Sequence, residues 1–237
     1  MSSTPATGRV ATRRTRTRAA LLEAAERAFV RHGFNGVTME RLAEEADVSV
    51  GSIYGHFSNK DGLYVAVATR AVELFGEYLQ RAYAASDSPL EQVMTAGDAY
   101  LRFHLEHPGR FRFIAFDGVE SRPSIANDAE DRVLAERLAA VLDGFRDRIG
   151  AAVACGEAGP HVDPELTARF LFGAWNGMVA LTLRHDALGL DDAGISACTM
   201  QARRIVVEGL TAPAHRGGDG RATARLLDLP SAPPATG

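Results

Sequence analysis

The 237-residue chain lacks the features that mark membrane, secreted and metal-cluster proteins. It has no run of about 18 apolar residues, the length that crosses a bilayer as a helix. Its N-terminus holds Ser, Thr and Arg in place of the apolar core of a secretory signal. Two cysteines, Cys155 and Cys198, are too few for a disulfide framework or a cysteine-bound metal cluster. We therefore expect a cytoplasmic protein with free thiols.

Motifs of common enzyme classes are also missing. The chain contains no G-x-S-x-G, no phosphate-binding P-loop, no G-x-G-x-x-G and no H-E-x-x-H. These absences predict a protein that is not an enzyme and needs no cofactor. A helical enzyme with scattered acid and base residues remains an alternative, which measured turnover would distinguish from saturable binding alone.

Charge is distributed unevenly along the chain. The net charge is -4, yet residues 1–70 carry ten basic and seven acidic side chains, so the acidic excess lies entirely in the remainder. Arg9, Arg13, Arg14, Arg16 and Arg18 follow one another with no acid between them. A basic head on an acidic body suggests an anionic partner for the head, such as DNA. A solvated, disordered tail would explain the same charges.

Hydrophobic periodicity predicts helices throughout, and no segment alternates with the period of a strand. An all-α fold is therefore expected. Gly33 is a stop signal, Thr38 and Ser49 are N-cap candidates, and Ser58 to Asp61 resemble a capping box. The predicted helices span residues 14–32, 38–46, 49–57, a long segment from 60 through 78, 89–107, 110–116, 127–155, 164–189 and 192–210.

The second and third of these helices are joined by the short turn Ala46-Asp47-Val48-Ser49, which is typical of a helix-turn-helix. The third helix begins with the small residues Val50, Gly51 and Ser52, which let its backbone enter a major groove. Ile53 and Phe57 would anchor it to the bundle. Lys60 follows, where a cation can hold a phosphate.

Residues 33–63 resemble the DNA-binding domain of the TetR/AcrR transcriptional regulators, most specifically in Ile53-Tyr54-x-His56-Phe57-x-x-Lys60. The resemblance covers about residues 14–64. It implies an all-helical homodimer, an N-terminal reader of a palindromic operator and a C-terminal ligand-binding body. It also implies repression that a small molecule relieves.

These observations predict a double-stranded DNA site on the head. Serine can donate or accept at either base pair, and Val50 can touch a thymine methyl. Tyr54 and His56 match family positions that contact the DNA backbone, although packing of the short helix is an alternative. The third helix has no Arg, Asn or Gln, so specificity would come from an arginine in a minor groove or from DNA shape. The predicted DNA-binding residues are Arg13, Arg14, Arg16, Thr38, Ser49, Val50, Gly51, Ser52, Tyr54, Gly55, His56 and Lys60.

Aromatic and histidine residues later in the chain suggest a pocket for a small, lipophilic effector. The predicted lining is Phe75, Tyr78, Tyr100, Phe103, His104, His107, Phe116, Trp175, Asn176 and Met178. Core packing is the alternative for each residue, and a filled core would indicate a DNA-binding protein that senses no ligand. His104 and His107 have the spacing of metal ligands, but no Cys or third His lies nearby, so no metal site is expected.

A dimer is expected because one short recognition helix reads too few bases. Small residues at Gly173 and Gly177 would allow two helices to approach closely. The predicted interface is Phe170, Gly173, Gly177, Leu181, Arg184 and Ile205, with packing inside one chain as the alternative. The predicted organisation is a loose arm at 1–12, a DNA-binding domain at 13–60, a ligand-binding and dimerisation domain at 61–211 and a disordered tail at 212–237.

Overall fold

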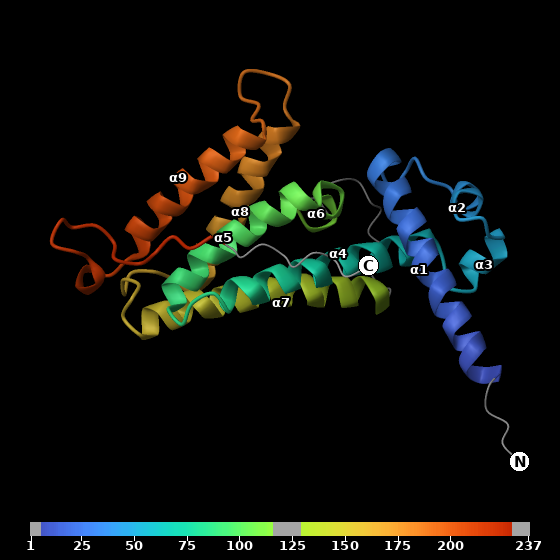
Figure 1. The fold of residues 1–237 in the computed structure, drawn as a ribbon, viewed down its shortest axis with the longest axis horizontal. Helices are drawn as coiled ribbons and strands as arrows, with labels where there is room; N and C mark the ends of the chain where they lie inside the picture. Colours follow the sequence, from blue (N-terminus) through green and yellow to red (C-terminus); the bar gives the residue numbers. More distant parts are fainter. Residues whose placement is uncertain (1–5, 116–128, 229–237) are drawn as a thin grey trace, which may run out of the picture. The chain divides into compact units, whose positions relative to one another are not determined.

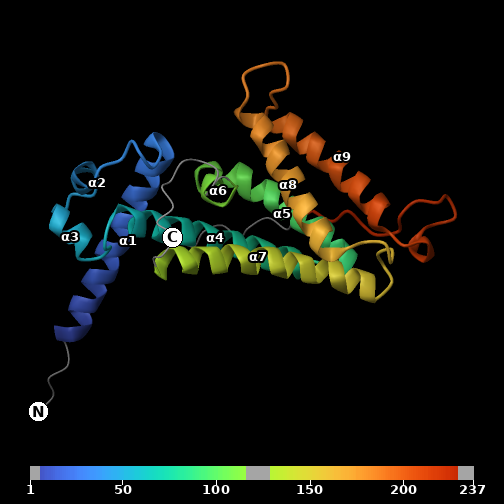
Figure 2. The same ribbon diagram turned by 180° about the vertical axis from the view of Figure 1, so that it is seen from behind.

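A computed structural model describes residues 6–115 and 129–228 of the chain. The described residues form α-helices, two 3-10 turns and isolated β-bridges, with no strand, and this confirms the all-α prediction for these residues (Figures 1 and 2). The helices are α1 (Ala6–His32), α2 (Met39–Glu45), α3 (Val50–Tyr54), α4 (Lys60–Tyr83), α5 (Pro89–Glu106), α6 (Pro108–Ala115), α7 (Ala129–Ala154), α8 (Pro164–Ala180) and α9 (Asp192–Leu210). None of these helices is long and apolar enough to cross a membrane.

The chain divides into two compact units. The head unit consists of Met1–Val72 and Gly109–Arg137, and the body unit consists of Glu73–Pro108 and Leu138–Gly237. The division falls inside α4 and α7, so each of these helices contributes residues to both units. The head therefore includes α6 and the first half of α4, beyond the boundary at residue 60 that the sequence suggested.

In the head, α1 packs against α2, and α2 packs against α3. Gly33 ends α1 with a φ of 66°, a left-handed conformation that glycine adopts without steric cost. Asp47 has a φ of 51° in the turn between α2 and α3, where a short polar side chain tolerates this region. The apolar faces meet in a small core that includes Leu21, Leu22, Ala25, Phe29, Leu42, Ile53 and Phe57.

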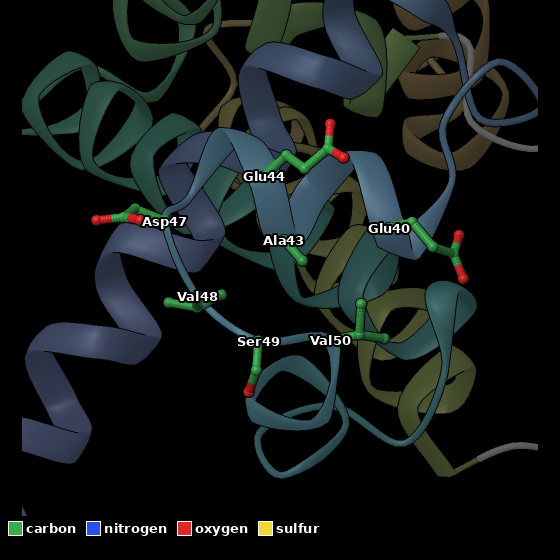
Figure 3. Close-up of a pocket in the computed structure, with 7 residues that line it drawn as sticks. All are labelled: Glu40, Ala43, Glu44, Asp47, Val48, Ser49 and Val50. Carbon is green, nitrogen blue, oxygen red and sulfur yellow. The ribbon is translucent and has the colours of Figure 1, made fainter.

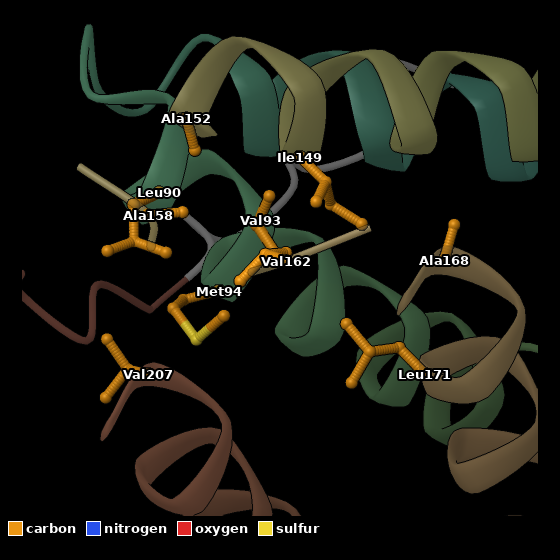
Figure 4. Close-up of a cluster of buried hydrophobic side chains, with 10 residues drawn as sticks. All are labelled: Leu90, Val93, Met94, Ile149, Ala152, Ala158, Val162, Ala168, Leu171 and Val207. Carbon is orange, nitrogen blue, oxygen red and sulfur yellow. The ribbon is translucent and has the colours of Figure 1, made fainter. Parts of the chain in front are cut away.

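In the body, α5 packs against both α8 and α9, and α8 packs against α9. Figure 4 shows a buried apolar cluster to which α5, α7, α8 and α9 all contribute. Its members are Leu90, Val93, Met94, Ile149, Ala152, Ala158, Val162, Ala168, Leu171 and Val207. Full burial of each Leu, Val, Ile or Met side chain contributes about 1.5–3 kcal/mol, so this cluster holds the body together.

Several predicted boundaries need correction. α1 begins at Ala6, so residues 6–12 are helical and do not form part of a loose arm. Once α1 is nucleated by its packed half, each added residue gains a backbone hydrogen bond at little further cost. α3 ends at Tyr54, before the predicted 57, and α8 ends at Ala180, well before 189. Predictions for residues 1–5 and for Phe116 lie outside the described residues.

The cap of α4 also differs from the prediction. The side chain of Asn59, one residue after Ser58, accepts a hydrogen bond from the backbone N–H of Gly62 at 2.7 Å. Asn59 is therefore the N-cap, and the capping box predicted from Ser58 is wrong. The N-caps predicted at Thr38 and Ser49 are confirmed by side-chain hydrogen bonds to the first turns of their helices. Ser88 and Asp163 cap α5 and α8 in the same way.

Residues 212–228 form an ordered strap on the body, so the prediction of disorder is wrong for this part of the tail. Ala222, Ala224 and Leu226 pack against the apolar cluster. Arg225 pairs with the buried carboxylate of Glu91 at 2.9 Å, and Arg203 donates to the carbonyl oxygen of Leu227. Hydrogen bonds from Arg225 lower the pKa of Glu91 to about 2. A buried charge needs such a partner, and the pair of Glu91 with Arg225 therefore holds residues 212–228 on the body.

Candidate DNA-binding surface and effector site

Two N-cap hydroxyls determine where the two helices of the helix-turn-helix begin. The Thr38 hydroxyl accepts from the backbone N–H of Arg41 at 3.2 Å and begins α2. The Ser49 hydroxyl accepts from the backbone N–H of Ser52 at 3.1 Å and begins α3. Both caps satisfy amide groups that would otherwise lack intrahelical partners. The geometry of the reading helix therefore depends on residues that were also predicted to contact DNA.

One side of α3 is open to solvent. Ile53 is fully buried and anchors the helix, whereas Gly51 is exposed and Val50 and Ser52 are half-buried. Tyr54 is 52% exposed, and this favours DNA contact over packing for its side chain. These residues form a small surface with hydroxyl and methyl groups available to base edges.

Arginines of α1 lie beside the C-terminal end of α3. Arg14 donates to the carbonyl oxygen of Gly55 at 3.5 Å, and the Arg18 guanidinium lies 5.1 Å from the centre of the Phe57 ring. Burial of the His56 imidazole lowers its pKa, and the positive charges of Arg14 and Arg18 lower it further. The lowered pKa favours the neutral form of His56, and Arg14 and Arg18 of α1 supply positive charge beside α3.

Arg18 was not among the predicted site residues. It follows Arg14 by four positions, so the two side chains share one face of α1. That spacing was the available signal, because Arg14 was already assigned to DNA. Arg13, Arg14 and Arg16 are exposed, as a phosphate or minor-groove contact requires, but they project from a regular helix and not from a flexible arm.

The Lys60 ammonium contacts groups of the chain itself. Its Nζ atom donates to the carbonyl oxygen of Val37 at 2.9 Å and lies 4.2 Å from the centre of the Phe34 ring. Phe34 in turn contacts the rings of Phe29 and Tyr64. Lys60 therefore links the first residue of α4 to the segment between α1 and α2.

An open hollow of about 470 Å³ lies between α2 and α3. Figure 3 shows the residues that line it, which are Glu40, Glu44 and Asp47 together with Ala43, Val48, Ser49 and Val50. Three acidic residues around one open hollow make it unfavourable for a phosphate. A DNA backbone would therefore be favoured along the arginines of α1 and disfavoured at this hollow.

In the body, the structure brings most of the predicted effector residues together. The rings of Phe75 and Tyr78 on α4 contact Phe103 on α5 with centroid separations of 5.3 Å each. Phe75 also meets Tyr100 at 5.7 Å, and Phe103 meets His107 at 5.4 Å. We call these five residues the aromatic cluster.

Polar groups at the edges of this cluster are satisfied by one another. The Tyr78 hydroxyl donates to the Glu106 carboxylate and lies 3.1 Å from the His107 Nε2 atom. Burial and the hydrogen bond to Glu106 raise the pKa of Tyr78 to about 12. The Tyr100 hydroxyl donates to the side-chain oxygen of Asn176 on α8, and burial raises the pKa of Tyr100.

Of the other predicted effector residues, Trp175 and Met178 lie on α8 and His104 lies on α5. Trp175 packs on Gly97, where an added Cβ atom would lie 2.8 Å from the indole Cζ2. Met178 lies 3.6 Å, sulfur to sulfur, from Cys198 on α9. His104 is buried, and burial lowers its pKa while the charge of Asp192 opposes this shift.

The predicted dimer residues lie on an exposed face of α8 and α9. Phe170 is 68% exposed and Ile205 is 63% exposed, and Leu166 and Met200 extend the apolar surface. Gly173 and Gly177 are exposed, and among the described residues no atom beyond the adjacent backbone of α8 lies within 4 Å of a Cβ atom built on either. A face with this much exposed apolar area is typical of an interaction surface. Leu181 and Arg184 follow at the end of α8, and Arg184 pairs there with Asp186.

Together, an all-helical fold, a capped helix-turn-helix with flanking arginines and a separate helical body define a helix-turn-helix transcriptional regulator. Comparison with known proteins identifies the family of regulators to which it belongs. Residues 21–67 match the family described as bacterial regulatory proteins of the tetR family, and residues 93–202 match the tetracyclin repressor-like C-terminal domain. The chain therefore belongs to the TetR family of bacterial transcriptional regulators.

Individual relatives agree with this assignment. The transcriptional repressor AcnR of Corynebacterium glutamicum is 29% identical over 167 residues, which cover 70% of this chain and 81% of AcnR. The regulator YhgD of Bacillus subtilis is 30% identical over 151 residues, covering 62% of this chain and 74% of YhgD. The structure of the ketosteroid transcriptional regulator KstR2 of Mycobacterium tuberculosis has the same fold, with a TM-score of 0.62, 21% identity and coverage of 82% of this chain and 94% of KstR2.

Proposed function

We propose that this regulator is a cytoplasmic repressor that binds a palindromic operator as a homodimer and is released by a small, lipophilic effector. The observation that carries the DNA-binding part is the exposed reading face of α3, held by the caps at Thr38 and Ser49. It stands beside the arginines of α1, and its first residues, Ser49 and Val50, border the acidic hollow. The relative AcnR is a transcriptional repressor, and this supports repression over activation for the present protein.

The division of labour on DNA follows from side-chain chemistry. Val50, Gly51 and Ser52 face base edges, and Tyr54, Gly55 and His56 lie where α3 meets the DNA backbone. Arg13, Arg14 and Arg16 neutralise phosphates or enter a minor groove. Because a serine and a valine discriminate weakly between bases, DNA shape supplies part of the specificity.

Dimerisation through α8 and α9 supplies the second recognition helix, which reads the second half-site of the operator. The exposed apolar face around Phe170 and Ile205 supports this interface, since burial of such a face removes apolar area from water. Two-fold symmetry then sets two recognition helices about 34–36 Å apart, one turn of DNA.

The aromatic cluster and its neighbours Trp175, Asn176 and Met178 support the effector site. Mostly apolar walls with a few polar groups suit a lipophilic ligand, and the name of KstR2 links a protein of this fold to ketosteroids. Effector binding would favour a spacing of the recognition helices that does not fit the operator. By reciprocity, the operator must weaken effector binding by the same factor.

A second function has a specific observation in its favour. The rings of the aromatic cluster contact one another, and Trp175 fills the space beside Gly97. A filled core of this kind fits a DNA-binding regulator that senses no small molecule. A rise in the melting temperature on addition of lipophilic candidates would contradict this alternative.

Selection of DNA from a random pool by the purified protein tests the proposed function. We expect an enriched palindrome, and we expect Ser52→Ala to change the preferred base at one position of each half-site. Glu77→Gln, an exposed change on α4 in the body, is a matched control that leaves the selected sequence unchanged. Salt-sensitive binding with no enriched sequence would overturn sequence-specific regulation.

A further inference from the structure

The end of the strap, residues 222–228, contains no helix and runs along the body. After α9 the chain turns back and passes beside α5 and α9 (Figure 1). Ala222, Ala224 and Leu226 pack against the apolar cluster, and the residues between them are exposed. Such an alternation with a period of two is the pattern of an extended peptide that lies on a surface.

Arg225 fixes the position of this segment on α5. Its backbone N–H donates to the Glu91 carboxylate at 2.8 Å, and its side chain donates to both carboxylate oxygens, at 3.0 and 2.9 Å. The Glu91 side chain is buried, whereas that of Arg225 is 68% exposed. A two-pronged guanidinium–carboxylate pair is specific for arginine, because the ammonium of lysine cannot form it.

A second charged contact joins the segment to α9. The buried Arg203 guanidinium donates to the carbonyl oxygen of Leu227 and to the Asp228 carboxylate, the latter at 3.4 Å. Arg203 also lies 3.5 Å from Asp98 on α5, so it keeps an acidic partner if the segment leaves. The body therefore offers an anion to the arginine of the segment and a cation to its acid.

The helical core of the body is complete without the segment. The ten buried members of the apolar cluster all lie between Leu90 and Val207, and the strap residues that touch the cluster are only partly buried. Opening of the segment would therefore hydrate Glu91 and a few apolar atoms while the helices stay packed. Such local opening is expected where few buried contacts hold a segment.

We propose that the surface of α5 and α9 around Glu91 and Arg203 is a docking site for an extended segment that carries an arginine and, three residues later, an acid. Residues 222–228 occupy this docking site as a ligand in cis, which leaves and returns while the body stays folded. The match to the family's C-terminal domain ends at residue 202, so the family assignment supplies no role for this segment.

Occupancy of the docking site acts on α9. The segment binds Glu91 on α5 and Arg203 on α9, and it therefore ties the two helices together. Met200 and Ile205 are exposed on the same α9 helix. Because this exposed face forms the dimer in the proposed function, on which this consequence rests, release of the segment should weaken dimerisation.

Hydrogen exchange of the wild-type chain at low urea concentrations tests the docking site without any substitution. We expect the amides of residues 222–228 to exchange by local opening, at rates that hardly depend on urea. Amides in the middle of α5, such as that of Met94, should exchange more slowly and follow global unfolding. The same rate and urea dependence for both groups would overturn the proposal.

A labelled peptide of residues 221–228 tests recognition in trans. The full-length variant Arg225→Ala/Leu226→Ala, the open variant, should leave the docking site free and bind one peptide. The wild-type chain should bind the peptide at least about tenfold more weakly, because a site that its own segment fills in about nine chains of ten is open in only one.

Peptide variants test the role of the arginine. The peptide carrying Arg225→Ala should bind the open variant at least about tenfold more weakly, the size of one lost charge-assisted hydrogen bond. Arg221→Ala, which changes an exposed arginine of the same strap, is the matched control and should bind as the unchanged peptide does. Equal binding of the peptide to the wild type and the open variant, or binding that does not depend on Arg225, would overturn the proposal.

Hydrogen exchange decides the question if the open variant fails to fold. In sedimentation equilibrium, the folded open variant should form less dimer than the wild type, and saturating peptide should restore the dimer. A monomeric wild type refutes the proposed dimer and leaves the docking site to be decided by exchange and peptide binding. A dimer that is unchanged in the open variant overturns the action of the docking site on α9.

Discussion

Replacement of Gly177 by alanine would separate the stability of the single chain from that of the dimer. Gly177 lies on the exposed face of α8, and in the described part of the chain no atom beyond the adjacent helix backbone lies within 4 Å of a Cβ atom built there. Within one protomer the new methyl group therefore meets no neighbour. In the proposed dimer, the same position faces a helix of the partner at close range.

The effect of the added methyl group on the stability of the single chain and its effect on dimerisation have opposite signs, and the size of each can be estimated. Alanine is favoured over glycine inside a helix by about 0.8–1.0 kcal/mol, so the single chain should become more stable by about this amount. A methyl group forced into a packed interface costs about 1–3 kcal/mol, and two-fold symmetry places it there in both protomers. Each 1.4 kcal/mol weakens the dimer about tenfold. The substitution should thus weaken dimerisation by at least about tenfold.

Sedimentation equilibrium measures the dimer dissociation constant, and thermal unfolding of the dilute protein measures the single chain. Gly144→Ala is the matched control, because Gly144 lies in α7 with nothing within 4 Å of its added Cβ atom. It should raise stability without affecting dimerisation. If Gly177→Ala dimerises as tightly as the wild type, close approach of two helices at Gly177 is refuted.

Three further changes probe the body and the head. Glu91→Gln should lower stability at pH 7 by about 1–2 kcal/mol, discounted for the solvent exposure of its guanidinium partner. Because the folded-state pKa of about 2 is below the ordinary value of 4.5, this contribution is complete above pH 4.5 and is lost as the pH falls toward 2. Gly97→Ala should be destabilising by urea unfolding, because its methyl group would press on Trp175. Arg14→Ala should raise the pKa of His56 in an NMR titration, because it removes a nearby positive charge.

Each of these three predictions has a control. Arg225→Ala should reproduce the pH dependence of Glu91→Gln, and equal stabilities of wild type and Glu91→Gln at neutral pH would contradict the buried pair. Gly76→Ala, with open space around its added Cβ atom, should stabilise and should differ from Gly97→Ala by about 1–3 kcal/mol. An unchanged His56 titration in Arg14→Ala, equal to that of the distant Arg31→Ala, would show that Arg14 does not act on His56.

The reading motif could be predicted closely because its determinants are local. Thr38 and Ser49 cap helices through hydrogen bonds to amides three residues away, and such pairs are visible in the sequence. The buried positions of α2 and α3 follow the helical period for the same reason. Sequence alone thus determined the helix order, the helix-turn-helix and the family resemblance.

Contacts between distant residues could not be predicted in this way. Glu91 and Arg225 are 134 positions apart, so only the tertiary structure showed that their pairing orders residues 212–228. Lys60 was predicted to hold a phosphate from its place at a helix start, and only the tertiary structure showed that its Nζ atom also donates to the carbonyl oxygen of Val37, 23 residues earlier. Gly97 and Trp175 likewise meet only because α5 packs on α8. Local hydrogen bonds and hydrophobic periodicity made the helices predictable from the sequence. The contacts of each side chain depend on charge burial and packing between residues far apart in the chain, and only the tertiary structure shows these.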